Sequence, residues 1–426
     1  MWFLYELLYL IGFLVYAPRA LWRRRLPHDG WTMRLGRYPA RVVEAVQGHH
    51  PVWVHAVSVG EVLAARPLLR ALAQARPDEP VVLSTITPAG FTVASQQGPH
   101  VIPVYFPLDL SGCARRALDT LHPACLLLIE SELWPNALRI AASRGVPIAI
   151  VNGRLSPRAF ARYRFMRPLL RGLFGQVGMF LMQSQADADR VLALGVPAER
   201  VRVTGSLKWD ASLSIRPEPQ TVRELAVRLG LGEHDMVIVG GSTHRGEEQP
   251  LLEAFQRLRA SHPFLRLILA PRHMERLAEV GELARRSGAR AACTSSLPGA
   301  GAWDVALVDS FGQLPLYYAL ASVVVIGGSF IPHGGQNPLE ATSVGKPVVF
   351  GPSMHNFETI AHQLLAHHAA RQAAGPRELA ALLAELVEHP EDAREMGRRA
   401  QELTERFQGA TQRTIEALRP LFGDRT

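Results

Sequence analysis

The segment Ile326-Gly-Gly-Ser-Phe-Ile-Pro-His-Gly-Gly-Gln-Asn-Pro-Leu-Glu-Ala341 holds the pattern from which the fold can be predicted. An apolar run at 322–326 leads into two Gly-Gly pairs, and a helical pattern begins near Asn337. A strand, a glycine-rich loop and a helix in that order are typical of parallel α/β domains. Backbone N–H groups in the loop and the dipole of the helix favour an anion there. The segment therefore predicts a phosphate site, with Glu340 one helical turn further on and within reach of a nucleotide sugar.

A glycine-rich turn between two core elements is the alternative interpretation of this segment, because short glycine motifs have a high false-positive risk. Two Gly-Gly pairs in one loop, followed by Asn-Pro-Leu-Glu, favour the ligand site. The glycine spacing differs from that of a dinucleotide fingerprint, and the lack of Gly-Lys-Ser/Thr excludes a P-loop. The segment is thus a candidate anion site of another kind.

Apolar runs of strand length alternate with helical patterns along the chain, which predicts parallel sheets covered by helices on both faces. The expected strands of the first half lie at 52–57, 81–85, 101–105, 124–129, 147–151 and 179–182. Those of the second half lie at 236–240, 265–270, 302–308, 323–326 and 347–350. The stretch Arg216-Pro-Glu-Pro-Gln220 between the halves is typical of a linker. We therefore expect an α/β protein of two doubly wound, Rossmann-like domains that face a cleft.

The composition is that of a globular protein of 426 residues, with 48% hydrophobic and 20% charged residues, long enough for two or three domains. The formal net charge of +8 indicates an anionic partner, such as a phosphorylated substrate or an acidic membrane surface. No recognisable nucleic-acid module accompanies that charge, so nucleic acid is not an expected partner. The three cysteines, Cys113, Cys125 and Cys293, lack metal-ligand spacing and indicate a reduced compartment.

The N-terminal segment, Trp2–Trp22, is apolar apart from Glu6 and Arg19, and the basic cluster Arg23–Arg25 follows it. Its length is marginal for a transmembrane span, and its aromatic residues and arginines suit a membrane interface. We expect it to span the membrane with the rest of the chain in the cytoplasm, or to lie flat as an amphipathic anchor. A hydrophobic helix packed on the first domain is the alternative.

The basic and aromatic stretch at 154–171 is either a solvated face or a surface for an anionic amphiphile.

Ligands of open parallel α/β sheets bind at the carboxyl ends of the strands, so residues that follow each strand are candidates for chemistry. Glu61 follows the first strand, and it either caps the next helix or acts as a catalytic carboxylate. Glu130 ends the strand at 124–129 and precedes a Trp-Pro pair, which a surface position explains poorly. In the second half, Arg272 follows a strand and can pair bidentately with a phosphate, with a surface ion pair as the alternative.

Together these motifs resemble those of the 3-deoxy-D-manno-octulosonic acid (Kdo) transferases, the lipid A Kdo transferases of Gram-negative lipopolysaccharide synthesis. The resemblance runs through nearly the whole chain as ordered blocks. The blocks are His55–Glu61, Thr85–Gly90, Glu130–Asn136, Gly205–Lys208, Ser242–Glu248, Pro271–His273 and the segment at 326–341.

The resemblance implies a GT-B glycosyltransferase, in which residues 26–207 bind the acceptor, 208–220 form a linker and 221–426 bind the CMP-sugar. The last helix of the second domain can pack back on the first domain, and residues 1–25 form a membrane anchor or interfacial helix. The implied reaction moves Kdo from CMP-Kdo to the tetraacylated lipid A precursor, with inversion, at the cytoplasmic face of the inner membrane. No cofactor is implied beyond the donor substrate, and no metal is expected because no Asp-x-Asp site appears.

By the same resemblance, Glu61 is the expected catalytic base, and Glu130 and Lys208 are expected to support the transition state. Lys208 is also expected to reach the carboxylate or phosphate of the donor. The residues expected to bind CMP-Kdo are Pro271, Arg272, Phe311, Gly312, Gln313, Gly334, Gly335, Asn337, Pro338, Leu339 and Glu340.

Two residues depart from the family pattern: Gln336 stands where histidine is common, and Gln313 where glutamate is frequent.

The alternatives to a Kdo transferase are a GT-B transferase with another nucleotide sugar and a non-catalytic, two-lobed anion-binding protein. Two carboxylates and a lysine at one site argue against the second, because an anion clamp gains nothing from carboxylates. The number of Kdo units transferred does not follow from these motifs.

Overall fold

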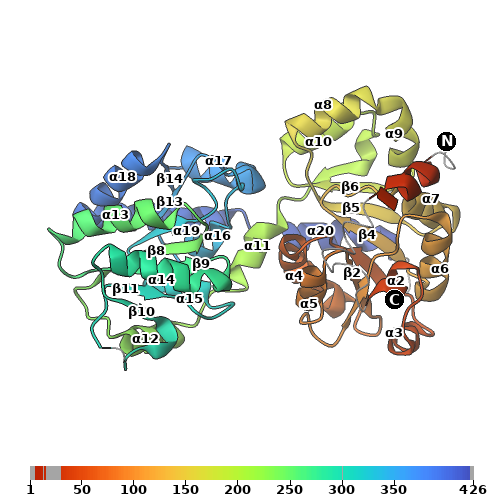
Figure 1. Cartoon of the computed structure of the whole chain (residues 1–426). Helices are drawn as coiled ribbons and strands as arrows, with labels where there is room; N and C mark the ends of the chain where they lie inside the picture. The colour runs from red at the N-terminus through yellow and green to blue at the C-terminus, as the bar shows by residue number, and fades with distance from the viewer. Residues whose placement is uncertain (1–4, 13, 16–29, 300, 423–426) are drawn as a thin grey trace. The chain divides into compact units, whose positions relative to one another are not determined.

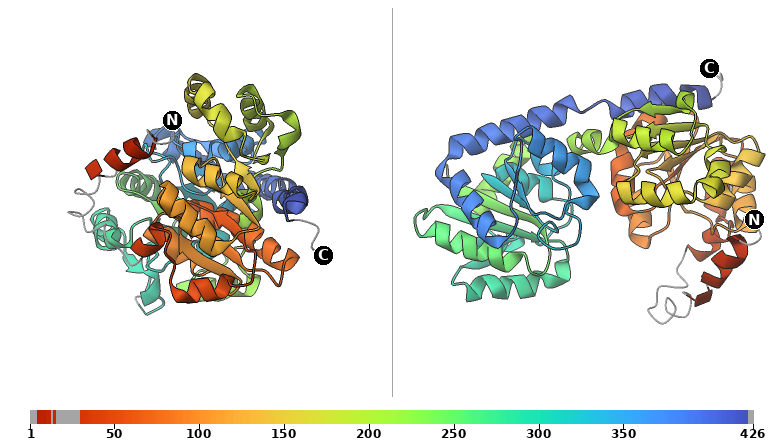
Figure 2. Two further views of the ribbon diagram at one scale, coloured as in Figure 1. Left: turned by 90° about the vertical axis from the view of Figure 1, so that its right-hand side faces the viewer. Right: turned by 90° about the horizontal axis from the view of Figure 1, so that it is seen from above.

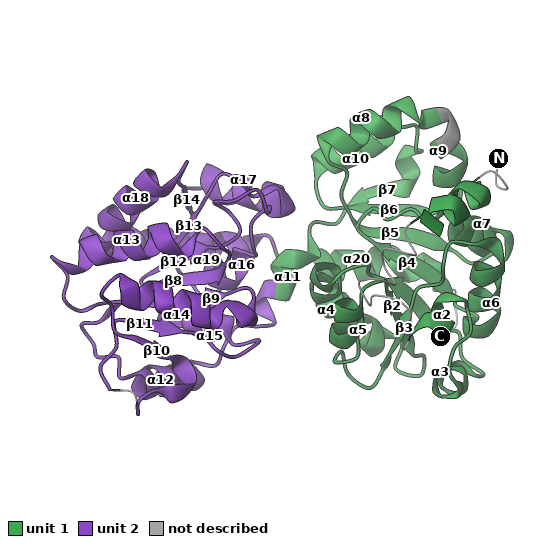
Figure 3. Cartoon of the chain, viewed as in Figure 1, with its two compact units in different colours: residues 1–211, 408–426 green, residues 212–407 purple. Residues whose placement is uncertain are grey.

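The computed structural model describes residues 5–12, 14–15, 30–299 and 301–422. The chain divides into two compact units, residues 1–211 with 408–426 and residues 212–407 (Figure 3). Each unit is built on one parallel sheet of seven strands (Figure 1).

The sheet of the first unit has the strand order β3-β2-β1-β4-β5-β6-β7, and all its pairings are parallel. Its strands are β1 Val52–His55, β2 Val81–Thr85, β3 Val101–Tyr105, β4 Cys125–Ile129, β5 Ile148–Gly153, β6 Met179–Met182 and β7 Val201–Val203. Its helices are α2 Trp31–Arg34, α3 Ala40–Val46, α4 Val59–Ala75, α5 Pro88–Ala94, α6 Ser111–Leu121, α7 Pro135–Ser143, α8 Pro157–Phe165, α9 Arg167–Phe174, α10 Gln185–Ala193 and α20 Ala410–Leu418. Because the strands are parallel, their carboxyl ends lie at one edge of the sheet.

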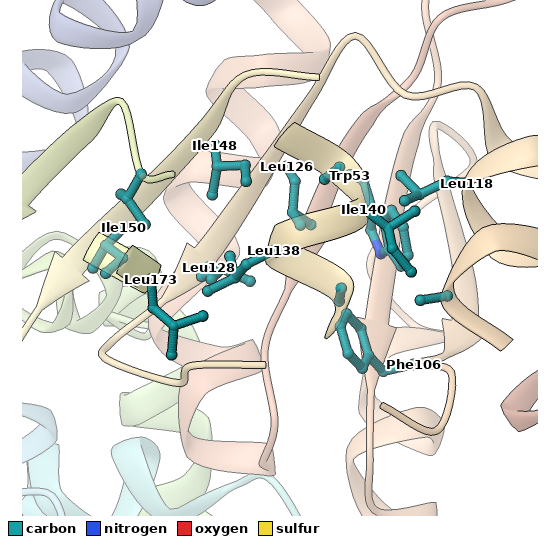
Figure 4. Close-up of a cluster of buried hydrophobic side chains, with 14 of the residues drawn as sticks. Trp53, Phe106, Leu118, Leu126, Leu128, Leu138, Ile140, Ile148, Ile150 and Leu173 are labelled. Carbon is teal, nitrogen blue, oxygen red and sulfur yellow. The ribbon is translucent and has the colours of Figure 1, made fainter. Parts of the chain in front are cut away.

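Alternating side chains of the strands divide between the two faces of this sheet. Leu126 and Leu128 of β4 belong to one apolar cluster, together with Trp53 of β1 (Figure 4). The intervening residue Leu127 and the following Ile129 belong to a second cluster. Strands buried on both faces appear in the sequence as continuous apolar runs. For this reason the central strands could be predicted from short apolar segments.

The sheet of the second unit has the order β10-β11-β9-β8-β12-β13-β14, again with parallel pairings throughout. Its strands are β8 Met236–Thr243, β9 Leu265–Pro271, β10 Ala291–Cys293, β11 Val305–Leu307, β12 Val323–Ile326, β13 Val348–Phe350 and β14 Arg371–Gln372. Its helices are α12 Pro219–Leu229, α13 Glu248–Arg259, α14 Leu277–Arg286, α15 Leu314–Leu320, α16 Leu339–Thr342, α17 Glu358–Ala366, α18 Pro376–Glu388 and α19 Pro390–Arg406. Its apolar core includes Phe255 of α13, Leu267 of β9 and Leu383 of α18.

Three strands, β7, β10 and β14, lie outside the predicted runs. All three are edge strands, and β7 and β14 consist of the mainly exposed residues Val-Arg-Val and Arg-Gln. An edge strand pairs on one side only and needs few apolar side chains. Their formation is therefore decided by the neighbouring strand, which leaves no apolar signal in the local sequence.

The last helix, α20, packs against α4 of the first unit (Figure 2). Its Ile415 belongs to the apolar cluster that also contains Val52 and Val54 of β1. Asp210 holds the start of this helix. Its Oδ1 accepts a hydrogen bond from the N–H of Gly409 at 2.9 Å, and its Oδ2 accepts one from Thr411 at 2.6 Å. The C-terminal helix is thus attached to the first unit by an apolar face and by the cap at its start.

The boundary between the units falls after residue 211, inside helix α11 (Leu207–Leu213). The stretch predicted as a linker, 208–220, therefore contains part of a helix. The predicted second domain, 221–426, also extends past the second unit, because residues 408–426 belong to the first.

The N-terminal segment is described only in part, and within it residues 5–12 and 14–15 are helical. The rest of the predicted anchor at 1–25, including the basic cluster at 23–25, lies outside the described residues. Within the described residues, no helix combines the length and the apolar character that crossing a membrane requires.

Polar side chains attach the described part of this helix to the first unit. The hydroxyl of Tyr5 donates to Oδ2 of Asp109 at 2.7 Å, and the N–H of Ser111 donates to Oε1 of Glu6 at 2.7 Å. The large apolar side chains of the same helix are exposed. These exposed residues are Leu7, Leu8, Leu10, Ile11, Leu14 and Val15.

Replacing Asp210 with alanine removes the acceptor of two N–H groups at the start of α20. We expect the free energy of unfolding to fall by about 1–2 kcal/mol in urea denaturation, the magnitude of a lost helix cap. Glu416→Ala on the exposed side of α20 is the matched control, with an expected change below about 0.5 kcal/mol. Equal losses in the two variants would contradict the capping role of Asp210.

Candidate functional site

The winding of the first sheet reverses between β1 and β4. From β1 the chain proceeds to β2 and β3 on one side, and it then crosses to β4 and continues to β7 on the other. The loops after β1 and β4 therefore lead away from each other and leave room for a ligand at the carboxyl ends of the strands. Glu61 follows β1 and Glu130 follows β4. The topology thus brings both predicted carboxylates to the reversal point.

Glu61 is held in a capping box at the start of α4. The hydroxyl of Ser58, the N-cap residue, donates to Oε1 of Glu61 at 3.0 Å, and it also accepts from the N–H of Glu61. Oε2 of Glu61 accepts from the N–H of Val57 at 2.8 Å. This is a variant of the capping box, because the amide that the glutamate binds belongs to the residue before the N-cap. Helix capping, one of the two predicted roles of Glu61, is therefore present, and it also fixes the orientation of the carboxylate.

The carboxyl of Glu61 has an unusual affinity for protons. Burial raises its pKa to about 7, and the neighbouring Glu130 carboxylate acts in the same direction, against the hydrogen bonds from Val57 and Ser58. An ordinary glutamate has a pKa of about 4.3 and is a poor base at neutral pH. A carboxyl perturbed by burial and by a specific charged neighbour, at the ligand edge of a sheet, is a candidate general base.

Glu130 forms an ion pair with Lys208, with 3.1 Å between Oε1 and Nζ. The backbone of Glu130 has a φ of 63°, in the left-handed region that residues other than glycine rarely adopt. Glu132, two residues on, has a pKa raised by burial and then by the charge of Glu130. The three predicted catalytic residues therefore belong to one region of the first unit, where Glu130 contacts Lys208 and acts electrostatically on Glu61.

Asn152 was missed by sequence reasoning, and it positions the helix that carries Lys208. It is fully buried at the end of β5 and has a φ of 56°. Its Oδ1 accepts a hydrogen bond at 3.0 Å from the N–H of Leu207, the first residue of α11. The available signal was an asparagine after an apolar strand, because asparagine tolerates the left-handed conformation better than most residues.

The second sheet repeats this topology, with the reversal between β8 and β12. Two glycines at this point, Gly241 near the end of β8 and Gly327 in the loop after β12, allow close packing. A Cβ on Gly241 would lie 1.9 Å from the hydroxyl of Tyr318, and one on Gly327 would lie 2.2 Å from the carbonyl oxygen of Ser242. These two positions exclude every residue with a side chain.

The amides of Gly334 and Gly335, which are predicted to hold a phosphate, have hydrogen-bond partners inside the chain. The N–H of Gly334 donates to Oγ of Ser353 at 3.1 Å, and that of Gly335 donates to the carbonyl of Gly328 at 2.8 Å. Both residues have positive φ, 101° and 74°, so glycine is needed there for the turn itself. The internal hydrogen bonds of the turn thus account for this Gly-Gly pair.

The helix predicted to begin near Asn337 is a single turn, α16. Its first N–H groups are partly satisfied inside the chain, because Oδ1 of Asn337 accepts from the N–H of Leu339 at 3.1 Å. One turn of helix aligns few peptide dipoles and stabilises an anion weakly. The helix start is therefore a weaker contribution to the predicted phosphate site than a long helix would be.

Glu247, for which sequence analysis predicted no individual role, joins the loops after β8 and β12. Its Oε2 accepts from the N–H of His244 at 2.9 Å and from that of Gly328 at 2.7 Å, and its Oε1 accepts from Phe330 at 3.0 Å. The residue is only 6% exposed. Charge-assisted hydrogen bonds of this kind are stronger than neutral ones. Glu247 therefore uses three further amides of the glycine-rich loops for structure.

Arg272 and Glu340, two of the predicted donor-binding residues, act on each other electrostatically. Burial raises the pKa of Glu340 to about 7, while the hydrogen bond from Asn337 and the charge of Arg272 oppose that rise. Arg272 follows β9 and is exposed. Within the described ranges, no carboxylate lies at ion-pair distance from its guanidinium. This guanidinium is therefore available to an anionic ligand.

The other predicted donor-binding residues also lie at or after the carboxyl ends of strands in the second unit. Pro271 ends β9, and Phe311 is 76% exposed after β11, where its ring can stack on a base. The hydroxyl of Ser310 donates to Oε1 of Gln313 at 3.0 Å. The remaining three residues of this set are Gly312, Pro338 and Leu339.

Three histidines gather beside these loops. The ring of His244 lies 4.2 Å from that of His333 and 5.6 Å from that of His273, measured between centroids. Among the residues that the structure describes, no group of three or more histidine, cysteine, aspartate or glutamate side chains is arranged to hold a metal ion.

Comparison with known proteins gives relatives that share one family name. Residues 29–211 match the family model of 3-deoxy-D-manno-octulosonic-acid transferase (kdotransferase). The 3-deoxy-D-manno-octulosonic acid transferase of Bordetella pertussis is 36% identical over 421 residues, which cover 95% of each chain. That of Haemophilus influenzae is 32% identical over 416 residues, which cover 96% of this chain and 94% of the other.

Among solved structures, the UDP-GlcNAc 2-epimerase from Neisseria meningitidis, bound to UDP-GlcNAc, has a TM-score of 0.62 at 15% sequence identity. The match covers 87% of this chain and all of the other. At this identity the likeness concerns the fold alone, and that fold is GT-B-like, with two Rossmann-like units.

The pKa of Glu61 can be measured by ¹³C NMR of protein labelled at its glutamate carboxyls, with Glu61→Gln to assign the signal. We expect a value of about 7. Glu130→Gln removes the neighbouring negative charge, so the pKa of Glu61 should fall. Glu132→Gln is the matched control and should lower it less, because Glu132 acts on Glu61 more weakly than Glu130 does. A Glu61 pKa that does not change in Glu130→Gln would show that the two carboxylates are not coupled.

Proposed function

Because this chain belongs to the 3-deoxy-D-manno-octulosonic acid transferase family and is therefore a glycosyltransferase, we propose that it transfers Kdo from CMP-Kdo to the tetraacylated lipid A precursor. One observation carries the proposal beyond family membership. The carboxyl of Glu61, with a pKa of about 7, stands at the reversal point of the first sheet beside the Glu130–Lys208 ion pair.

Glu61 acts as the general base of the reaction. Its carboxylate takes the proton of the acceptor hydroxyl while the oxygen forms a bond to the ketosidic carbon of Kdo. The bond from that carbon to the phosphate oxygen of CMP breaks, and its electron pair stays with the phosphate. One displacement of this kind inverts the configuration. A pKa near the working pH combines a deprotonated ground state with a strong drive to accept the proton.

Glu130 and Lys208 tune this base. The negative charge of Glu130 raises the proton affinity of Glu61, and Lys208 limits that effect by pairing with Glu130 at 3.1 Å. Asn152 holds the helix that carries Lys208. The Glu130–Lys208 ion pair and the hydrogen bond from Leu207 to Asn152 are formed within the protein itself. The electrostatic environment of Glu61 is therefore in place before the substrates bind.

The nucleotide of the donor binds at the carboxyl edge of the second sheet. Arg272 is a cation that pairs with the phosphate, whose charge grows as the bond to Kdo breaks. Glu340 is placed to accept hydrogen bonds from the ribose hydroxyls. The exposed ring of Phe311 offers a stacking surface for the base.

The protein acts at the anionic, cytoplasmic surface of the inner membrane, where its lipid acceptor is found. The exposed leucines of the N-terminal helix support this location, as does the exposed basic side of α8 with Arg158 and Arg162. Phe165 at the end of α8 is 91% exposed. Apolar side chains beside arginines are the combination that binds an anionic lipid interface.

Mass spectrometry of a reaction with purified protein, CMP-Kdo and the tetraacylated lipid A precursor tests this function. We expect the acceptor to gain the mass of Kdo, and the number of additions will be read from the same spectrum. Glu61→Gln should lower turnover by about a hundredfold or more, because a neutral amide cannot accept the proton. Unmodified acceptor after reaction with the unaltered protein would contradict the proposed function. Near-normal turnover in Glu61→Gln would contradict only the role of this residue.

Thermal unfolding tests the donor class. CMP should raise the melting temperature more than UDP at equal concentration, because a ligand stabilises the folded state in proportion to its binding. Arg272→Ala should reduce the shift caused by CMP, whereas Arg286→Ala, at an exposed position in α14, should leave it unchanged. A larger shift with UDP would favour another nucleotide sugar, and an unchanged shift in Arg272→Ala would exclude Arg272 as a phosphate ligand.

A further inference from the structure

We propose that His244 binds the phosphate of the nucleotide-sugar donor through the Nδ1–H of its imidazole. This inference rests on the proposed donor, and it names a further group that contacts the phosphate. His244 follows β8, at the reversal point of the second sheet.

The backbone of the glycine-rich loops leaves few donors for an anion. The N–H groups of His244, Gly328 and Phe330 are bound to the carboxylate of Glu247. Those of Gly334 and Gly335 are bound to Ser353 and to the carbonyl of Gly328. Because these five amides already have acceptors, side chains become important donors for a phosphate at this edge of the sheet.

The geometry of the His244 ring leaves one nitrogen available. Its Nε2 lies 3.2 Å from the amide nitrogen of Gln336. With that amide as the donor, Nε2 is the acceptor, so the neutral ring carries its proton on Nδ1. Nδ1 is not among the buried unpartnered atoms, and among the described residues it has no hydrogen-bond partner. His244 therefore presents an N–H donor that solvent reaches, although the residue is only 6% exposed.

Gly328 keeps the space beside this ring open. It has a φ of 67°, and a Cβ at this position would already lie 3.4 Å from Cδ2 of His244. Gln336 thus holds the ring on one side, and Gly328 leaves room beside it. A donor held in this way needs little reorganisation when an anion binds.

The charges that surround His244 favour an anion. Arg245 pairs with Glu279, and Arg276 pairs with Glu248, so these charges are largely balanced. Arg272 lacks such a partner within the described residues, and it adds positive potential at the ring. The other titratable groups around the ring are Glu247 on the loop after β8, His273 after β9, and His333 after β12.

The pKa of His244 agrees with this electrostatic picture. Burial first, and then the neighbouring His333, His273, Arg272 and Arg276 in that order, together lower this pKa to about 4. The ring is therefore neutral at pH 7, and it contributes a hydrogen bond without adding a charge. A bound anion would balance the positive charge of the neighbouring arginines, so the positive potential at the ring favours anion binding.

The methyl ester of CMP is a suitable probe for this contact. It is a phosphodiester, as in the sugar nucleotide, and it lacks the carboxylate of Kdo. Isothermal titration of the full-length protein should show that His244→Ala weakens binding about tenfold or more, the usual effect of losing a hydrogen bond to a charged group. His244→Asn, whose amide nitrogen can take the place of Nδ1, should recover most of the affinity. His273→Ala changes a more exposed ring of the same cluster and should alter affinity by less than about threefold.

A second measurement separates a direct contact from a structural role. In protein labelled with ¹⁵N-histidine, the Nδ1 signal of His244 should show the protonated tautomer and should shift when the probe binds. Equal affinity of the unaltered protein and His244→Ala for the methyl ester overturns the inference, as does an Nδ1 signal that does not respond. Absence of any binding by the unaltered protein would contradict the proposed donor itself.

Discussion

The reversal of winding in a parallel sheet is the constraint on which the rest of this molecule depends. In each unit the chain leaves the first strand toward one side of the sheet and later crosses to the other side. The loops that follow the two central strands therefore diverge at the carboxyl ends of those strands. In the first unit those loops carry Glu61 and Glu130. In the second they carry the His244 loop and the glycine-rich segment at 326–341. The same physical rule thus produces a site with acidic residues in one unit and a site with basic residues in the other.

The two sites use carboxylates in opposite ways. Glu61 is partly buried beside a second carboxylate, and its proton affinity rises accordingly. Glu247 is buried among backbone N–H groups, and its three hydrogen bonds hold two loops together. Both glutamates lie at the start of the helix that follows the first strand of their sheet: Glu61 in the first turn of α4 and Glu247 at the N-cap of α13. What separates a reactive carboxyl from a structural one is the number of amide donors and the sign of the nearest charge.

Sequence reasoning recovered the central strands and the main candidate residues for definite reasons. A strand buried on both faces must be apolar along its length, as Leu126–Ile129 shows. The rule that ligands bind at strand ends then selected Glu61, Glu130 and Arg272. The edge strands β7 and β14 were missed because they need no apolar residues. Asn152 and Glu247 were missed because their roles depend on amides that are distant in the chain or belong to a neighbouring loop.

The sequence by itself determined the fold class, the family and the positions of the candidate residues, because apolar periodicity and ordered motifs are local properties of the chain. Only the tertiary structure decided which backbone amides are free. The Gly-Gly pair at 334–335 has the composition of a phosphate loop, yet its N–H groups bind Ser353 and Gly328. A hydrogen bond between distant loops leaves no trace in either local sequence. For the same reason, the raised pKa of Glu61 became visible only when folding placed Glu130 beside it.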